Sequence, residues 1–497
     1  MAKILALDAG TSSVKCSVFD GEGRLLGARS AGYPTYHPQN GFSEQKGDDI
    51  LKAVESAVKE LASLPCGADI DCIGITGTMN GCIPINADGE ALYPNMIHLD
   101  TRAAEQVDRL SRRAGFYEFY RRTGNRPDVH YGLPKLMWLK DNEPEIYAGA
   151  RACVNTKDLI YGWLTGVHGL TDYSDASLFG ALNIHSLKWD ADICEAAEID
   201  MAKLPALRPS TDVSGRLSGN VAGLLGLKSG IPVAVGCGDG PATTHGSGVF
   251  DETGSYLTVG SSAWVAALNR TPCIDASARA FNYMDMDESL VTVCGTVQCA
   301  STAIDYMLRD VLRVTKDGAI DYDEAQNMFF ASPPGANGLV FVPTLMGERC
   351  PWWDPNARGA LLNLSLDHTR ADMVRAVYEG VAQELNLCVQ VLRDNGISAD
   401  EIILSGGGMR SRIFSDIFPS VFGAHTRLHL NPLEATSHGA AIAAGVGVGI
   451  WKSFADAAKT VKTGAESLPN EDMRKVYAKQ EKVFQKLYSL LKEAAAV

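Results

Sequence analysis

An acid followed by small hydroxyl residues near the N-terminus is the first pattern in the sequence that could do chemistry. Asp8 ends an apolar stretch and is followed by Gly10-Thr11-Ser12-Ser13, with Lys15 two residues further on. Consecutive backbone N–H groups and hydroxyls in a tight glycine turn form a cradle for anions. A carboxylate beside such a cradle would repel phosphate unless a cation lay between them. The pattern therefore predicts phosphate at the turn, Lys15 as a nearby positive charge and Mg²⁺ near Asp8. An ordinary hairpin with an Asx-type turn fits the same residues.

Two further turns of small residues resemble the first one. Gly260-Ser261-Ser262 separate two apolar runs within residues 255–268, and Gly406-Gly407-Gly408 follow a predicted strand at 401–404. A helix is predicted from about Ser411, and the N-terminus of a helix favours negative charge. Each turn alone is also a common hairpin or loop. Together they predict contacts to a nucleotide bound between two domains.

An acid between two glycines is the candidate general base. Gly238-Asp239-Gly240 belong to a glycine-rich turn after the apolar run 231–235. Phosphoryl transfer to a hydroxyl needs a carboxylate that orients the hydroxyl and accepts its proton. Asp239 could also be a simple turn-forming residue. The sequence contains no P-loop and no G-x-S-x-G elbow, so any nucleotide must be held in another way.

The composition limits the classes of partner. Lys and Arg number 45 and Asp and Glu 59, which gives a net charge of −14. This balance argues against a nucleic-acid surface. No apolar stretch reaches the ~20 residues that span a bilayer, and no signal peptide is visible. The 12 cysteines are scattered without a CxxC pair, so we expect reduced, buried thiols and no zinc site. We therefore expect a cytoplasmic protein without nucleic-acid or membrane partners.

The apolar patterns that must position these residues alternate between strands and helices. Strands are predicted at residues 3–8, 14–20, 23–33, 71–76 and 83–86, and helices at 48–63, 369–394 and 470–494. We expect Asp48 or Asp49 to cap the first helix and Asn395-Gly396 to end the second. This order of elements predicts a mixed α/β sheet.

The strand–turn–strand pattern at the N-terminus returns at residues 255–268. A chain of 497 residues is also long for one core. We therefore predict two related domains, residues 1–246 and 247–497. The stretch Thr244 to Gly248, with Asp251 to Gly254 after it, is the expected hinge.

At this point the motifs, in their order and spacing, resemble the FGGY carbohydrate kinases, most closely the xylulokinase-like branch. The resemblance runs from Ile4 to about Gly449. The motifs are Asp8-x-Gly10-Thr11-Ser12-Ser13, Gly74-Ile75-Thr76-Gly77-Thr78-Met79-Asn80-Gly81, Asp100-x-Arg102, Pro134-Lys135-Leu136-Met137-Trp138-Leu139, Thr156-Lys157-Asp158, Ser174-Asp175-Ala176, Gly238-Asp239, Gly260-Ser261-Ser262, Gly347-Glu348-Arg349-x-Pro351, Asp354-Pro355-x-Ala357-Arg358-Gly359, Glu379-Gly380 and Gly406-Gly407-Gly408-x-Arg410-Ser411.

The resemblance implies the actin, hexokinase and heat-shock-ATPase architecture, a ribonuclease H-like fold of two domains with ATP and Mg²⁺ in the cleft. It implies that Asp8 lies near the metal, that Thr11 and Ser12 cradle phosphate and that Asp239 is the base. The nucleotide would also meet Gly260, Ser261, Ser262, Ser301, Asp305, Gly407 and Ser411. The sugar would meet Met79 and Asn80, with Asp100 and Arg102 near that pocket.

Three departures from the xylulokinase pattern fall on the expected sugar side. Asn80 replaces a usual His, His98 a usual Trp, and Gly240 a usual Asn. A site that hydrogen-bonds substrate hydroxyls discriminates strongly among analogues. The resemblance therefore implies ATP-dependent phosphorylation of a primary hydroxyl on a small sugar, with a ketopentose such as D-xylulose as the leading candidate.

Other functions stay open at this point. Gluconate, ribulose, a tetrulose or tetritol, and an autoinducer-type sugar are alternative substrates within the family. An ATP-switched binding protein of the actin or heat-shock type is the non-enzyme alternative, and an inactive kinase is a third, although both Asp8 and Asp239 are present. The oligomeric state stays open, a homodimer included.

Overall fold

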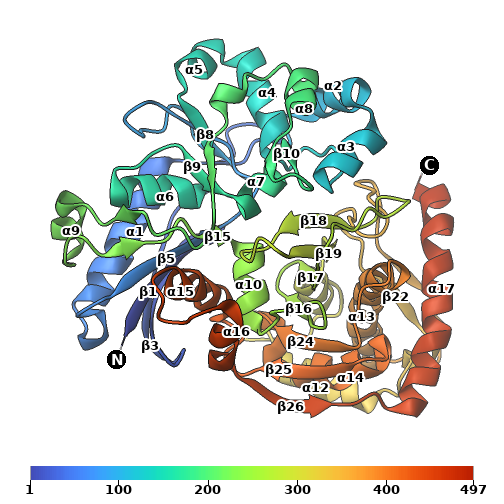
Figure 1. Cartoon of the computed structure of the whole chain (residues 1–497). Coiled ribbons are helices and arrows are strands. Elements are labelled where there is room, and N and C mark those ends of the chain that lie inside the picture. Colours follow the sequence, from blue (N-terminus) through green and yellow to red (C-terminus); the bar gives the residue numbers. More distant parts are fainter. Residues whose placement is uncertain (1, 496–497) are drawn as a thin grey trace.

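Two mixed β-sheets with the same strand order organise the chain in the computed structural model, which describes residues 2–495 (Figure 1). The first sheet contains β1 (Lys3–Ala9), β2 (Ser13–Asp20), β3 (Leu25–Gly32), β5 (Cys72–Gly77), β13 (Gly215–Arg216), β14 (Pro232–Val233) and β15 (Cys237–Gly238). The second contains β16 (Ser255–Val259), β17 (Ala263–Asn269), β18 (Phe281–Met284), β19 (Val291–Val297), β24 (Glu401–Ser405), β25 (His425–His429) and β26 (Thr463–Ser467).

The two sheets share their pairing pattern strand by strand. In the first, β1 pairs antiparallel with β2 and parallel with β5, and β14 pairs parallel with β5 and antiparallel with β13. In the second, β16 pairs antiparallel with β17 and parallel with β24, and β25 pairs parallel with β24 and antiparallel with β26. The predicted relation between the two strand–turn–strand units is therefore confirmed, as is the mixed α/β class.

The long helices form where the apolar pattern predicted them. They are α1 (Gly47–Ala62), α13 (Arg370–Asp394), α14 (Arg412–Phe422) and α17 (Glu471–Ala495). α13 begins with a capping box between Thr369 and Asp372 and ends at Asn395, as expected. The predicted side-chain cap of α1 is wrong. Lys46 occupies the N-cap without a side-chain bond, and Asp48 and Asp49 lie in the first turn, where carboxylates still favour the positive end of the helix dipole.

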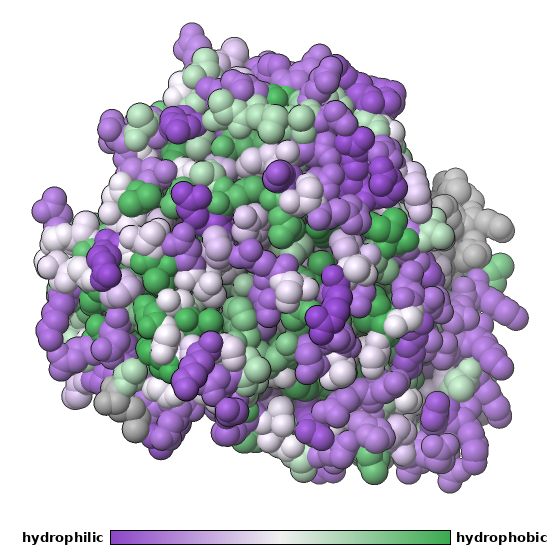
Figure 2. All heavy atoms as spheres, in the orientation of Figure 1, coloured by the Kyte–Doolittle hydropathy of each residue, from purple (hydrophilic) through white to green (hydrophobic). Residues whose placement is uncertain are grey.

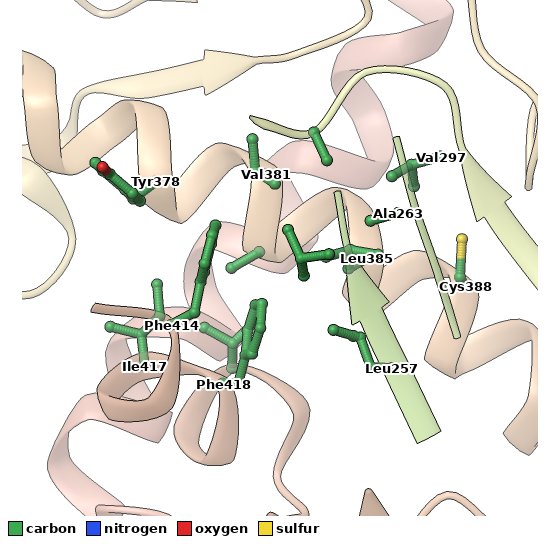
Figure 3. Close-up of a cluster of buried hydrophobic side chains, with 14 of the residues drawn as sticks. Leu257, Ala263, Val297, Tyr378, Val381, Leu385, Cys388, Phe414, Ile417 and Phe418 are labelled. Atoms are coloured by element: carbon green, nitrogen blue, oxygen red, sulfur yellow. The ribbon is translucent and has the colours of Figure 1, made fainter. Parts of the chain in front are cut away.

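α13 forms the centre of the second core. Figure 3 shows Val381 and Leu385 of α13 between the sheet residues Leu257 and Val297 and the aromatic side chains of α14. All of these side chains are buried, and stacking of Phe414 on Phe418 at a centroid distance of 4.7 Å extends the layer. This packing fixes the second sheet, and with it the turn between β16 and β17.

A third group of helices lies at the top of Figure 1, above the first sheet. It comprises α2 (Ala104–Ala114), α3 (Phe116–Thr123), α4 (Gly132–Asn142), α5 (Pro144–Gly149) and α8 (Ala191–Ala197). These helices bury a separate apolar cluster that includes Phe119, Leu136 and Ile193. The chain between β5 and β13 thus adds a layer that the duplicated sheets do not contain.

The first part of the segment predicted as a hinge is helical and not a loop, while its role as a hinge stays a prediction. Residues Asp239–Ser247 form α10, which packs against α15 (Ala435–Gly447). The two helices approach so closely that only glycine fits at two positions. A Cβ on Gly246 would lie 1.7 Å from the Ala435 carbonyl oxygen, and a Cβ on Gly439 would lie 1.9 Å from the Ala242 carbonyl oxygen. Only the later part of the predicted hinge, after the left-handed Gly248, is a loop between α10 and β16.

α15 also packs against the first sheet, although it comes late in the chain. It contacts β1 and β5, and a Cβ on Gly74 would lie 2.0 Å from the Ala440 carbonyl oxygen. The domain division at residues 246 and 247 stays a prediction, and the outermost residues of the two predicted domains, 1 and 496–497, lie outside the described residues. α15 shows that residues after 247 contribute to the core around β1.

The polarity of the surface and the state of the cysteines agree with the expectations drawn from the composition. Most of the face in Figure 2 is hydrophilic, with separate apolar patches. All 12 cysteines are free within residues 2–495, and 11 of them are buried. No helix in the described part of the chain is long and apolar enough to cross a membrane.

Candidate active site

Two cavities share the turn between β16 and β17. Gly260 lines a cavity of about 450 Å³, and Ser262 lines another of about 340 Å³. Gly260 N–H donates to the Ser262 carbonyl at 2.8 Å, much as Gly10 N–H donates to Ser13 in the first turn at 3.0 Å. The predicted second phosphate turn therefore stands where the two cavities come together.

The larger cavity gathers the residues predicted for the nucleotide. Its lining includes Gly260, Ser301, Asp305, Tyr322, Tyr378, Gly407, Gly408, Arg410, Ser411 and Phe414. Ser301 and Asp305 come from α11 (Ser301–Tyr306), and the Tyr322 hydroxyl donates to Asp305 at 2.7 Å. A Cβ on Gly407 would meet nothing within 4 Å, so the backbone there is open to the cavity. Apolar rings beside open backbone suit a planar base with a polar edge.

The smaller cavity gathers most of the residues predicted for the sugar and the base. Its lining includes Thr11, Thr78, Met79, Asn80, His98, His130, Asp239, Gly240, Ser262, Trp264, Phe281, Tyr283, Thr296 and Arg349. These residues come from both sheets and from the loops between them. Aromatic rings mixed with hydroxyl, amide and imidazole groups suit a small polyhydroxylated molecule.

Asp239 is the acid of this cavity. It is the first residue of α10, so the glycine-rich turn expected there is a helix N-terminus. Burial, together with the charge of Asp8, raises its pKa to about 7, although the backbone N–H groups of Gly240 and Asp239 act in the opposite direction. A carboxyl group with a pKa near neutrality can accept a proton at physiological pH and release it again.

A fully buried lysine supports the chain just before Asp239. Lys157 Nζ lies 3.0 Å from Asp172, whose other oxygen accepts the Ser174 hydroxyl at 2.6 Å. Ser174 Oγ in turn accepts the Gly238 N–H at 2.9 Å. These bonds fix the backbone immediately before the base.

Asp8 lies next to the first turn, on β1 opposite Lys15 of β2. Burial, together with the charge of Glu434, raises the pKa of Asp8 to about 6, although Lys15 and the Ser437 hydroxyl act in the opposite direction. Lys15 Nζ donates to the Leu433 carbonyl at 2.6 Å and to Glu434 at 3.4 Å. Its ammonium therefore links the first turn to the start of α15, and its predicted phosphate contact stays a prediction.

The acids near the first turn fit a magnesium ion only in part. No group of three or more His, Cys, Asp or Glu within residues 2–495 could hold a metal. One carboxylate beside phosphate-sized turns still suits Mg²⁺, which keeps several waters and takes other ligands from substrate phosphates.

Asn80 is oriented for a ligand. Its backbone is left-handed, with φ of 68°, and its buried side-chain oxygen has no hydrogen-bond partner among the described residues. Beside it, burial and the charges of Lys135, Arg349 and His130 lower the pKa of His98 to about 3, so its imidazole is neutral. His130 Nδ1 contacts Asp128.

Several predicted site residues do not line either cavity. Asp100 and Arg102 form a buried network with Glu44, in which Arg102 Nη2 lies 2.6 Å from Asp100 and 2.7 Å from Glu44. Arg102 is also stacked on Phe42. Their contact with a sugar stays a prediction, and in the structure they hold the loop that carries His98. Ser12, Ser13, Ser261 and Gly406 belong to the three turns but do not line the cavities.

Sequence reasoning assigned no role to several residues that line the smaller cavity, among them His130, Trp264, Tyr283 and Arg349. Arg349 belongs to the motif Gly347-Glu348-Arg349, so it could have been selected as a candidate. Tyr283 carries no local signal, because its position beside Gly240 depends on how the two halves of the chain meet.

Comparisons with known proteins agree with this geometry. Residues 3–246 match the N-terminal domain, and residues 255–448 the C-terminal domain, of the FGGY family of carbohydrate kinases. A xylulose kinase of Staphylococcus xylosus is 28% identical over 464 residues, which cover 91% of this chain and 92% of that protein. Two crystal structures from Lactobacillus acidophilus, each 25% identical, superpose with a TM-score of 0.92. One is of a gluconate kinase (99% of this chain, 98% of that chain), and the other of a ligand-bound xylulose kinase (100% and 99%).

Proposed function

The chain belongs to the FGGY family of carbohydrate kinases, and on that premise we propose that it transfers the terminal phosphate of ATP to a primary hydroxyl of a ketopentose such as D-xylulose. The larger cavity would hold ATP and the smaller one the sugar. Residues 1–246 would carry the sugar side and the first phosphate turn, and residues 247–497 the second turn and the adenosine side. The acidic net charge of −14 agrees with a cytoplasmic protein that binds neither nucleic acid nor membranes.

One observation carries this proposal: Gly260 and Ser262 of a single turn line the two cavities separately. A phosphoryl group held at that turn would lie between a nucleotide in one cavity and an acceptor in the other. Thr11 of the first turn also lines the acceptor cavity. Phosphoryl transfer depends mainly on this kind of positioning and on stabilisation of charge.

Asp239 would orient the acceptor hydroxyl and take its proton. Its pKa of about 7 places the carboxylate close to the pH at which a general base is most effective. Thr11 and the backbone of the two turns would bind the phosphate oxygens. Mg²⁺, when bound near Asp8, would neutralise charge on the phosphates.

The choice of sugar rests on relatives and on three residues. A xylulose kinase is among the similar proteins, and a gluconate kinase is among the similar solved structures. Asn80, His98 and Gly240 line the acceptor cavity where this sequence departs from the xylulokinase pattern. Gluconate is therefore the main competing substrate, with ribulose, a tetrulose or tetritol, and an autoinducer-type sugar after it.

A coupled assay of ADP release tests the proposal. Purified protein with MgATP is offered D-xylulose, L-ribulose, D-gluconate, erythrulose and glycerol separately, with a reaction without acceptor as the control. We expect D-xylulose to give the highest kcat/KM. A clear preference for gluconate would refute the ketopentose assignment, and no stimulation by any sugar would refute acceptor phosphorylation of this class.

A further inference from the structure

A buried lysine on α4 holds three segments of the acceptor cavity together. No part of Lys135 is exposed to solvent. Its Nζ donates to the backbone carbonyls of Asn80 at 2.7 Å, Ile97 at 2.8 Å and His130 at 2.7 Å. An ammonium group has three N–H donors and no acceptor, so these bonds use its whole capacity.

The three carbonyls belong to separate segments of the acceptor cavity. Asn80 and His130 line the cavity, and Ile97 directly precedes the lining residue His98. Asn80 follows β5, Ile97 follows β7 (Asn95–Met96), and His130 precedes α4. The first two segments are also linked next to these residues, because Met96 N–H donates to the Cys82 carbonyl at 3.3 Å, but the Lys135 ammonium joins all three segments at one point.

We propose that Lys135 is a positioning residue for acceptor specificity, because its single ammonium sets the relative places of the Asn80, His98 and His130 side chains. The inference rests on the proposed function, in which this cavity binds the sugar. Asn80 shows this positioning most clearly. Its left-handed backbone is held by the Lys135 bond while its side-chain Oδ1 is left without a partner within residues 2–495. An unpaired buried acceptor discriminates between sugars only if its position is fixed.

A simple packing role does not explain the choice of a lysine. Burying a charge is costly, and no ion pair joins Lys135 to a carboxylate among the described residues. A methionine would fill the same space without that cost. Three carbonyl oxygens that converge on one point need three donors, which an ammonium supplies from a single atom.

The charged and titratable groups around Lys135 predict its behaviour with pH. Burial, together with the charge of Arg102, lowers its pKa to about 8, although Asp100, Cys82 and Asp128 act in the opposite direction. His98 and Cys153 also respond to its charge. A neutral amine keeps only two N–H donors, so deprotonation breaks one of the three bonds from Lys135 to the carbonyls. Sugar binding should therefore weaken as the pH rises above about 8.

The test compares Lys135→Met with Lys140→Met, a matched change on the same helix. Lys140 Nζ donates to the Glu198 carbonyl and does not line the acceptor cavity. For Lys135→Met we expect the KM for the preferred sugar to rise at least tenfold. The ratio of kcat/KM between the best and the second-best sugar should fall at least tenfold. The KM for ATP and the basal hydrolysis of ATP should change less than twofold. Lys140→Met should leave all four values as in the wild type.

A second measurement uses only the wild-type protein, in case Lys135→Met does not fold. The sugar KM is followed from pH 6.5 to 9.5 with the ATP KM as internal control, and we expect only the sugar KM to rise above about pH 8. The inference is overturned if Lys135→Met folds and keeps the wild-type ratio between sugars, or if the wild-type sugar KM is flat over this range. If the wild type phosphorylates no sugar, the proposed function fails first. If it does and Lys135→Met keeps its selectivity, only the present inference fails.

Discussion

Replacing Asp239 by Asn should weaken activity and increase stability at the same time. Burial holds the pKa of this carboxyl at about 7, against 3.8 for an ordinary aspartate. Because the folded protein holds this proton more tightly than the unfolded chain, the contribution of Asp239 to stability is complete below pH 3.8 and is lost as the pH rises towards about 7. An asparagine side chain does not titrate, so its contribution to stability does not change with pH in this way.

The expected size of the stability change follows from the coupling between proton binding and folding. One pKa unit corresponds to about 1.4 kcal/mol, so the free energy of unfolding of Asp239→Asn minus that of wild type should be larger by roughly 2–3 kcal/mol at pH 8 than at pH 5, which means that the variant gains relative stability. Loss of the general base should lower kcat by roughly 10²- to 10⁴-fold. In the wild type, kcat should fall as the pH drops below about 7, because the base becomes protonated.

The assay is urea-induced unfolding at pH 5 and pH 8, together with ADP release at pH 8. The control is Asp108→Asn, which changes an exposed aspartate on α2 and should alter neither quantity. A stability difference that is the same at both pH values would show that Asp239 is not held with a raised pKa. A kcat within threefold of wild type would show that it is not the base.

Three other changes probe the acceptor cavity and the metal. Gly240→Ala would place a Cβ 2.9 Å from the Tyr283 ring, so we expect the sugar KM to rise roughly tenfold or more. The control Gly223→Ala, with open space around it, should leave the sugar KM unchanged. Equal sugar KM values for the two variants would show that the sugar does not fit against Gly240. Asn80→His should change the order of preferred sugars and leave the ATP KM unaltered, and an unchanged sugar profile would place the selective contacts elsewhere. Removal of Mg²⁺ with EDTA should abolish sugar-dependent ADP release, and full activity in EDTA would exclude the proposed metal. Asp8→Asn should raise the Mg²⁺ concentration needed for the half-maximal rate.

The sequence was sufficient to predict the parts of the fold that depend on local signals. The two turns at Gly10 and Gly260 are bounded by clear apolar runs, and each closes with the backbone bond expected of a hairpin. α13 has both a capping box and a terminal Asn-Gly, so its ends were predicted closely. These signals are contained within a few residues of the element that they determine.

The elements that the sequence could not predict depend on distant contacts. α10 contains two glycines besides a proline and lacks an apolar stripe, so its helical form depends on packing against α15. The position of α15 on the first sheet depends on Gly74, which lies far from it in the sequence.

The candidate site likewise divides into parts that local motifs predict and parts that depend on distant contacts. Asp8, Thr11, Asp239 and Gly260 belong to short motifs, and the structure brings them to one region. The role of Lys135 is different, because its three acceptors come from segments that are separate in the sequence. No local pattern shows that their carbonyls converge.

Identification of the product tests the central claim most directly. The wild-type protein is incubated with MgATP and D-xylulose, and the products are resolved by mass spectrometry and phosphorus NMR, with Asp239→Asn in parallel. We predict one sugar phosphate with the ester on a primary hydroxyl, formed in equal amount to ADP and absent with Asp239→Asn. ADP that accumulates at the same rate with and without sugars, with inorganic phosphate as the only other product, would contradict the account.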